Sequence, residues 1–325
     1  MKRATSIFAM TLAASAISCA IGSSLIVARA VAQADKTQDT TPLSPSVERE
    51  IDRVVTEIDR IEAQTLAQLS NGLPGPTRRT VLLGKLLLYD KQLSVHRNEA
   101  CAFCHMPETG FTGPISELNA TTVAYPGSVR TRFSQRKPQT HAYAPFAPRL
   151  HYNASQGDFV GGNFWDMRAT GIRLGNPAAE QAQAPPLNPV EMGLPDPACV
   201  VYRISKQPYR GLFEAVWGKQ SFAIRWPTNV TTVCDAPAPA STADATPVHL
   251  DDIERGIVQS TYDAMALSIA AYEASPEISA FSSKYDAVIG KSETFTAQEQ
   301  MGYGLFRGKA RCNECHRDGG PGPPA

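Results

Sequence analysis

Two Cys-x-x-Cys-His pentapeptides, at 101–105 and 312–316, constrain this chain more than any other feature of its sequence. In each, two thiols lie three residues apart and a histidine follows directly, which is the attachment signature of a c-type haem. The thiols would add to the two vinyl groups of the haem, and the histidine would ligate the iron. The side chains expected to hold two covalent haems are Cys101, Cys104, Cys312 and Cys315, with His105 and His316 as iron ligands.

Zinc bound by paired cysteines is the main alternative for these motifs. It requires no histidine after either pair, and the cysteine pairs of a structural zinc site usually lie far closer in sequence than roughly 200 residues. A thioredoxin-like redox motif explains one pair poorly and two pairs not at all. Covalent haem is therefore the better interpretation of both pentapeptides.

The N-terminus has the pattern of a secretory signal peptide. Positive charges within residues 1–3 precede a mostly apolar run at 7–27, and small-x-small cleavage patterns follow at 28–30 and 32–34. A retained membrane anchor is the alternative, but the many small residues in the run and the cleavage patterns disfavour it. We expect a signal peptide over 1–34, a periplasmic protein after its removal, and no later membrane span.

Composition excludes some functions and favours a helical fold. The formal net charge is zero, and no basic stripe predicts a nucleic-acid partner. The 25 prolines and 23 glycines indicate long irregular connections. Because Val, Ile and Thr are scattered rather than alternating, little sheet is expected. The sequence predicts a mainly α fold with long loops.

Several segments have helical periodicity. Residues 46–69 form an amphipathic pattern and are expected to pack on the domain that follows. Further helices are predicted at about 78–89, at 178–184 before a Pro-Pro pair, and at 253–274. Thr296 and Glu299 form a capping box that begins a helix leading to the second pentapeptide.

These segments predict a chain of two haem domains. Residues 106–163 lack periodicity and are expected to form loops over a cofactor. The expected parts are a signal peptide at 1–34, a polar linker and amphipathic helix at 35–77, a first haem domain at 78–217, a Pro/Ala-rich insertion or connection at 218–248, and the start of a second haem domain at 249–325.

Cys199 and Cys234 remain once the pentapeptides and the signal peptide are set aside. In an oxidising compartment these two residues could form a disulfide. Two unpaired buried cysteines are the alternative, and the sequence alone leaves the choice open.

The motifs together resemble the bacterial di-haem cytochrome c peroxidase family, which includes the MauG-type enzymes. The likeness covers about residues 78–320, in the order of the family. The segments that match, in addition to the two pentapeptides, are 83–94, 164–168, 180–182 with 188–193, and 296–306.

The resemblance implies two class I cytochrome c-like helical domains and a division of labour between their haems. The haem on His105 would be the peroxidatic centre, and the haem on His316 would collect electrons. Trp165 would relay electrons between them, Glu191 would act as acid and base over the peroxidatic iron, and Gln181 would help to shape the pocket. Hydrogen peroxide would be reduced to water with electrons from a small cytochrome c or a cupredoxin.

The sequence departs from the family's pattern at the distal side of the first haem. Classical members place a histidine there, but this chain has none between His105 and His141, and the slot falls at or near Ser128. An open, MauG-like site is therefore expected. His141 or His151 could replace the missing ligand only if the loop were rebuilt.

Two further departures concern calcium and chain length. Arg136 takes roughly the slot of an asparagine that contributes to the family's inter-domain calcium site, which puts calcium in doubt. The chain stops nine residues after His316, whereas the family continues for many tens of residues. We expect a fragment or an interrupted gene, with an incomplete second haem domain.

Three functions remain open at this stage. Peroxide reduction is the first, and MauG-like oxidation of a protein substrate is the nearest enzymatic alternative. The third is a di-haem electron carrier without enzymatic activity, in which Glu191 and the open site have no role. The oligomeric state is open as well, a homodimer included.

Overall fold

The computed structural model describes residues 43–155, 157–240, 246–314 and 316. The expected signal peptide and residues 35–42 lie outside this part of the chain. Within it, helices dominate and strands β1 (His151–Asn153) and β2 (Asp158–Val160) form one antiparallel hairpin, which confirms the mainly α prediction. A search of the described residues for a helix long and apolar enough to cross a membrane finds none.

Helix α2, Pro45–Ala67, begins at Ser44, whose Oγ accepts a hydrogen bond from the N–H of Val47 at 3.2 Å. A 3-10 turn, Gln68–Asn71, follows the helix. The predicted apolar face of α2 is buried against α3 (Pro76–Tyr89) and α4 (Cys101–Cys104), which confirms that this helix packs on the domain that follows. The buried apolar residues on α2 are Val47, Ile51, Val54 and Ile58.

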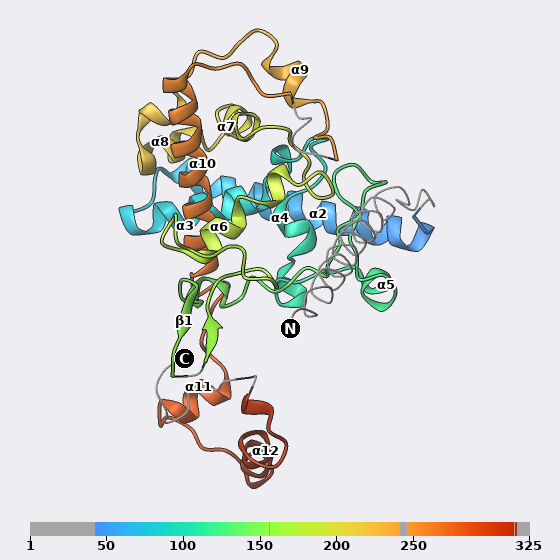
Figure 1. The fold of residues 1–325 in the computed structure, drawn as a ribbon, viewed down its shortest axis with the longest axis vertical. Helices are drawn as coiled ribbons and strands as arrows, with labels where there is room; N and C mark the ends of the chain where they lie inside the picture. Colours follow the sequence, from blue (N-terminus) through green and yellow to red (C-terminus); the bar gives the residue numbers. More distant parts are fainter. Residues whose placement is uncertain (1–42, 156, 241–245, 315, 317–325) are drawn as a thin grey trace, which may run out of the picture.

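Helix α10, Asp252–Glu273, crosses α3 at the centre of the molecule (Figure 1). It begins with a capping box of Asp251 and Glu254. At the crossing, a Cβ on Gly84 would lie 1.9 Å from the carbonyl oxygen of Ser268, so only glycine allows the two backbones to approach this closely.

Shorter elements surround this crossing. Those between α4 and α10 are η3 (Pro107–Thr109), α5 (Ser116–Ala120), η4 (Ala144–Phe146), α6 (Pro177–Ala182), η5 (Pro185–Leu187), α7 (Pro197–Ile204), α8 (Arg210–Trp217), η6 (Lys219–Phe222) and α9 (Val230–Cys234), and η2 (Lys91–Leu93) precedes α4. Helix α6 begins at 177, one residue before the predicted start at 178, and ends at 182, two residues before the predicted end at 184. The Pro-Pro pair then begins a 3-10 turn. Irregular backbone fills most of 106–163, as the sequence predicts.

The described parts of 218–248, which are 218–240 and 246–248, pack on the region that carries the first pentapeptide. Cys199 of α7 and Cys234 of α9 form a disulfide, with their Cα atoms 5.2 Å apart. Val230 and Val248 are buried in the same core as α7. Of the two alternatives left open by the sequence, the structure therefore has the disulfide.

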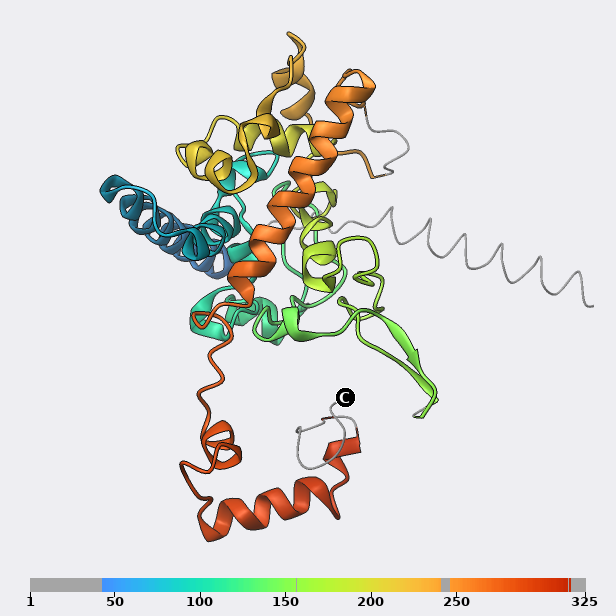
Figure 2. The ribbon, with the colours of Figure 1, turned by 90° about the vertical axis from the view of Figure 1, so that its left-hand side faces the viewer.

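The packing of α10 argues against a domain boundary at 249. This helix contacts α3, α6 and α7, and so belongs with the first haem region. Helices α11 (Lys284–Ile289) and α12 (Ala297–Arg307) lie away from the main body in both views, beyond the stretch 274–283 (Figures 1 and 2). We propose that the boundary lies in 274–283. The predicted capping box of Thr296 and Glu299 is present at the start of α12.

Candidate functional site

A cavity of about 1240 Å³ lies at the end of α4, between α6, α10 and the loops that precede α6. It is large even among cavities that hold small molecules and cofactors, which typically measure about 300–1,000 Å³. Cys101, Cys104, His105, Trp165, Gln181 and Glu191 all line this cavity. The structure therefore brings Trp165, the expected relay between the haems, to the same cavity as the five residues that the pentapeptide and the resemblance assign to the first haem site.

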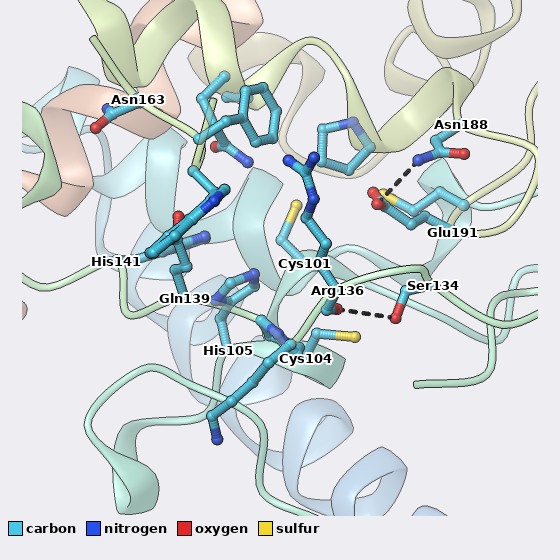
Figure 3. A pocket seen from close by; sticks show the side chains of 18 of the residues that line it. Cys101, Cys104, His105, Ser134, Arg136, Gln139, His141, Asn163, Asn188 and Glu191 are labelled. Carbon is cyan, nitrogen blue, oxygen red and sulfur yellow. Dashed lines mark hydrogen bonds between the residues drawn. The ribbon is translucent and has the colours of Figure 1, made fainter. Parts of the chain in front are cut away.

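Helix α4 is a single turn that holds the two thiols of the first pentapeptide beside this cavity (Figure 3). Neither Cys101 nor Cys104 takes part in a disulfide. Burial raises the pKa of both thiols, that of Cys101 to about 12. The two thiols are therefore protonated and lie at the spacing that thioether attachment requires.

His105 presents one ring nitrogen as a potential ligand. Its Nδ1 lies 3.0 Å from the carbonyl oxygen of Phe111, which can only accept a hydrogen bond, so Nδ1 carries the proton. Burial, followed by the neighbouring His141, holds the pKa of His105 well below its usual value. The imidazole is therefore neutral, with Nε2 unprotonated. Proteins commonly orient a metal-binding histidine by a hydrogen bond from its other ring nitrogen, as Nδ1 makes here.

His141 and Glu273 form a buried pair next to His105. The rings of His141 and His105 are stacked, with centroids 3.6 Å apart and an angle of 22° between their planes. Nδ1 of His141 lies 3.0 Å from Oε1 of Glu273, but neither ring nitrogen nor that oxygen has a hydrogen bond of good geometry. Because unpartnered buried polar atoms are costly, this corner of the cavity fits a ligand that carries polar groups of its own.

Glu191 lies across the view from His141 in Figure 3, beside Asn188. The Nδ2 of Asn188 donates a hydrogen bond to Oε1 of Glu191 at 2.9 Å. Burial raises the pKa of the Glu191 carboxyl, against smaller opposing effects of Asn188 and Arg168. A carboxyl group whose pKa moves toward neutrality can both accept and donate a proton near pH 7.

Trp165 lines the cavity but is 78% exposed. The preceding residue, Phe164, has a positive φ of 66°, and the guanidinium of Arg168 stacks on its ring at 3.6 Å. Asp166 bonds to Arg168 at 2.8 Å and to Arg136 at 3.0 Å. This short loop therefore presents an indole to the outside at the mouth of the cavity.

The structure also shows the surroundings of Ser128, His151 and His141, the residues considered for the distal ligand. Ser128 is fully buried, and its Oγ donates to Asn98 at 2.7 Å. His151 is exposed on β1. His141 does enter the cavity, but it stacks beside His105 rather than facing it, and two stacked imidazoles do not have the arrangement of ligands on opposite sides of one iron. Among the described residues, no group of three or more His, Cys, Asp or Glu side chains could hold a metal ion.

The second pentapeptide is described only in part, because Cys315 lies outside the described residues. Cys312 begins the 3-10 turn η8, Cys312–Glu314, and the N–H of His316 donates to the carbonyl of Cys312 at 2.8 Å. His316 is exposed.

Two buried carboxylates of the cavity, Glu99 and Glu273, were not predicted from the sequence. Glu99 is 3% exposed and bonds to Arg130 at 3.1 Å; it precedes Cys101 by two residues, and no pattern distinguishes it. Glu273 did carry a signal, since it lies four residues after Ile269 on the apolar side of the predicted 253–274 helix. A charge on a buried stripe is a reason to look for a partner or a ligand.

The donor set fits a covalent haem. It combines two thiols at the spacing of a c-type attachment, an imidazole whose Nδ1 is hydrogen-bonded to a carbonyl, a cavity of sufficient size and a corner with unsatisfied polar atoms. A carboxyl group with a raised pKa adds acid–base capacity to the same cavity. Fold and site together define a helical protein whose cavity has the residues that a covalently attached haem requires.

Comparison with known proteins identifies the family. The model of the family described as di-haem cytochrome c peroxidase matches residues 78–294. This chain belongs to that family, which confirms the resemblance read from the motifs.

Two relatives show how the chain compares with characterised members. It is 36% identical over 235 residues to the methylamine utilization protein MauG of Paracoccus denitrificans, covering 72% of this chain and 50% of MauG. Its structure is similar to the crystal structure of the diheme peroxidase BthA from Burkholderia thailandensis, with a TM-score of 0.54 and 28% identity over 75% of this chain and 49% of BthA. The chain spans about half the length of these relatives.

Proposed function

We propose that this protein is a periplasmic di-haem peroxidase that reduces hydrogen peroxide to water, with electrons from a small cytochrome c or a cupredoxin. The observation that carries the proposal is the presence of Glu191, with its raised pKa, in the same cavity as Cys101, Cys104 and His105. An electron carrier has no use for an acid–base group beside its haem.

Each residue has a distinct role in this proposal. Cys101 and Cys104 attach the haem, and Nε2 of His105 ligates its iron. When bound, the haem supplies an iron that accepts peroxide and passes electrons to it. Reduction of one peroxide consumes two electrons and two protons and yields two water molecules.

Glu191 manages the protons of this reaction. With the haem bound, its carboxylate would take a proton from one oxygen of peroxide and return it to the other oxygen, which would leave as water. Asn188 holds Oε1 of Glu191 by a hydrogen bond of 2.9 Å. Gln181 helps to shape this part of the cavity, which it lines.

Electrons enter through the second haem, on Cys312, Cys315 and His316, and pass to the cavity by Trp165. The exposed indole at the cavity mouth supports this role, because a relay between two haem domains has to lie on the surface of the first.

MauG-like oxidation of a protein substrate is the second candidate. The 36% identity to MauG favours it. Peroxide would then bind in the same cavity, but the electrons would come from aromatic side chains of the substrate protein and enter by way of Trp165.

Glu191→Gln in the haem-loaded full-length protein tests the proposal. We expect both haems to be retained and peroxide-dependent oxidation of a reduced small cytochrome c to fall about a hundredfold to ten-thousandfold, the usual contribution of general acid–base catalysis. The control is Glu214→Gln on α8, which removes only an exposed pair with Arg210 and should change the rate little.

The other outcomes separate the alternatives. Unchanged turnover in Glu191→Gln would remove Glu191 from the mechanism. A wild-type protein that exchanges electrons rapidly but never turns over peroxide would be a carrier. Weak turnover with cytochrome c, together with a long-lived peroxide-oxidised state that oxidises an added protein, would favour the MauG-like activity.

A further inference from the structure

The loop 126–132, here called the bridge loop, joins the haem-attachment segment to the segment that carries Glu191. Ser128 is its centre and is fully buried. The Oγ of Ser128 accepts a hydrogen bond from the N–H of His96 at 3.0 Å and donates to Oδ1 of Asn98 at 2.7 Å. The carbonyl of Ser128 accepts from Nδ2 of Asn98 at 3.0 Å, so one residue of the loop is held by several bonds to 96–98.

Arg130 adds a second attachment on the same side. Its Nη2 donates to the carbonyl of Asn98 at 3.0 Å, and its Nη1 lies 3.1 Å from Oε2 of the buried Glu99. Its guanidinium also stacks on the ring of Phe103, within the first pentapeptide, at 4.6 Å. The loop is therefore fixed to the residues immediately before Cys101 and to α4 itself.

The opposite side of the bridge loop contacts the backbone of Glu191. The N–H of Ser128 donates to the carbonyl of Glu191 at 2.8 Å. A Cβ on Gly127 would lie 2.4 Å from the carbonyl oxygen of Val190 and 2.7 Å from that of Glu191, which is too close for any side chain. Gly127 thus permits the contact, and Ser128 makes the hydrogen bond.

Glu191 depends on such contacts because it is not part of a helix or strand. Its own N–H donates to Asn188 at 3.0 Å, and the neighbouring carbonyl of Met192 accepts from Val95 at 2.8 Å. These bonds hold the segment 188–192 in place, and Ser128 adds a link from the backbone carbonyl of Glu191 to Asn98, which lies just ahead of Cys101.

We propose that Gly127 and Ser128 are positioning residues, which set the place of the Glu191 carboxyl relative to the haem attached at Cys101 and Cys104. This inference rests on the acid–base role proposed for Glu191. The bridge loop is held by hydrogen bonds on both sides, so it acts as a fixed spacer between the two segments. Because a misplacement of about 1 Å can cost about a hundredfold in rate, a small shift of this loop should be measurable.

Gly127→Ala and Ser128→Ala test the inference, each made in the wild type and in Glu191→Gln. The first forces the loop away from 190–191, and the second removes the hydroxyl that anchors it to 96–98. Two quantities are measured on the ferric, haem-loaded protein: the rate of its reaction with peroxide, and the affinity for cyanide by spectral titration. Hydrogen cyanide must also lose a proton to bind, so its affinity reports on Glu191 without turnover.

We expect Gly127→Ala to lower both quantities about tenfold or more, and Ser128→Ala severalfold, when Glu191 is present. In the Glu191→Gln background, either change should alter them less than twofold, because residues that act through one another are not additive. The matched control is Gly211→Ala on α8, where a Cβ would meet nothing within 4 Å and both quantities should be unchanged.

Equal losses with and without Glu191 would overturn the inference, since the loop would then act on the whole pocket. Wild-type values in both loop variants, together with a clear loss in Glu191→Gln, would overturn the inference and leave the proposed function intact. If Glu191→Gln itself shows no loss, the inference fails together with the acid–base role of Glu191 on which it rests. If Gly127→Ala fails to incorporate haem, Ser128→Ala decides by the same comparison.

Discussion

Two Gly→Ala substitutions in the crossing helices should have opposite effects on stability. Gly84 lies in α3 at the crossing with α10, and Gly256 lies in α10 where a Cβ would meet nothing within 4 Å. In an exposed helix interior, alanine is more favourable than glycine by about 0.8–1 kcal/mol. Gly256→Ala should therefore stabilise the protein by up to about 1 kcal/mol.

The same gain in helix propensity is available at Gly84, but the contact geometry outweighs it. A Cβ there would lie 1.9 Å from the carbonyl oxygen of Ser268 and 2.8 Å from Cβ of Tyr272. Ordinary contacts are about 3.5 Å, so the two helices would have to separate by about 1.5 Å. Overpacking of a well-packed core costs about 1–3 kcal/mol, and more where the obstacle is backbone, so Gly84→Ala should be destabilising overall.

Urea unfolding of the two variants and the wild type measures this difference. If the three proteins have the same dependence of unfolding free energy on urea, the midpoint urea concentration should be lowest for Gly84→Ala, intermediate for the wild type and highest for Gly256→Ala. A Gly84→Ala protein as stable as Gly256→Ala would show that α3 and α10 do not cross at this point, and the assignment of α10 to the first haem region would be refuted.

Further predictions concern the covalent links and the haem content. Cys199→Ala with Cys234→Ala should lower the free energy of unfolding by about 4 kcal/mol, the loop-closure value for a separation of 35 residues, and a loss below about 1 kcal/mol in chemical unfolding would contradict this. Protein exported with a haem-maturation system should carry two haems by intact mass under denaturing conditions, whereas Cys101→Ala with Cys104→Ala should carry one. A single haem in the wild type, or bound zinc, would refute the di-haem assignment.

Helix positions could be predicted because they depend on local pattern. The capping box of Thr296 and Glu299, the apolar face of α2 and the extent of α10 all follow from residues within a few turns of each other. The pentapeptide predicted the roles of Cys101, Cys104 and His105, the resemblance to a family added Gln181 and Glu191, and all five line one cavity.

The parts that could not be predicted depend on tertiary contacts. Packing of α10 on α3 needs Gly84 to meet Ser268, and no local pattern reveals that pairing. The same packing brings Glu273 to His141, 132 positions earlier in the chain, and stacks His141 on His105. The sequence predicted only that Ser128 lies at or near the position of a missing ligand. Its hydrogen bonds to Asn98 and to the backbone of Glu191 depend on tertiary contacts and are seen only in the structure.

The state of the first haem's distal side tests the central claim most directly. Glu191 lies in the cavity, Ser128 is buried in the bridge loop, and His141 stacks beside His105. A ferric iron held only by His105 should therefore be high-spin and open to peroxide. Electron paramagnetic resonance of the oxidised, as-isolated protein should show a high-spin signal from this haem before any reduction. A purely low-spin signal of a haem with two histidine ligands would contradict the account.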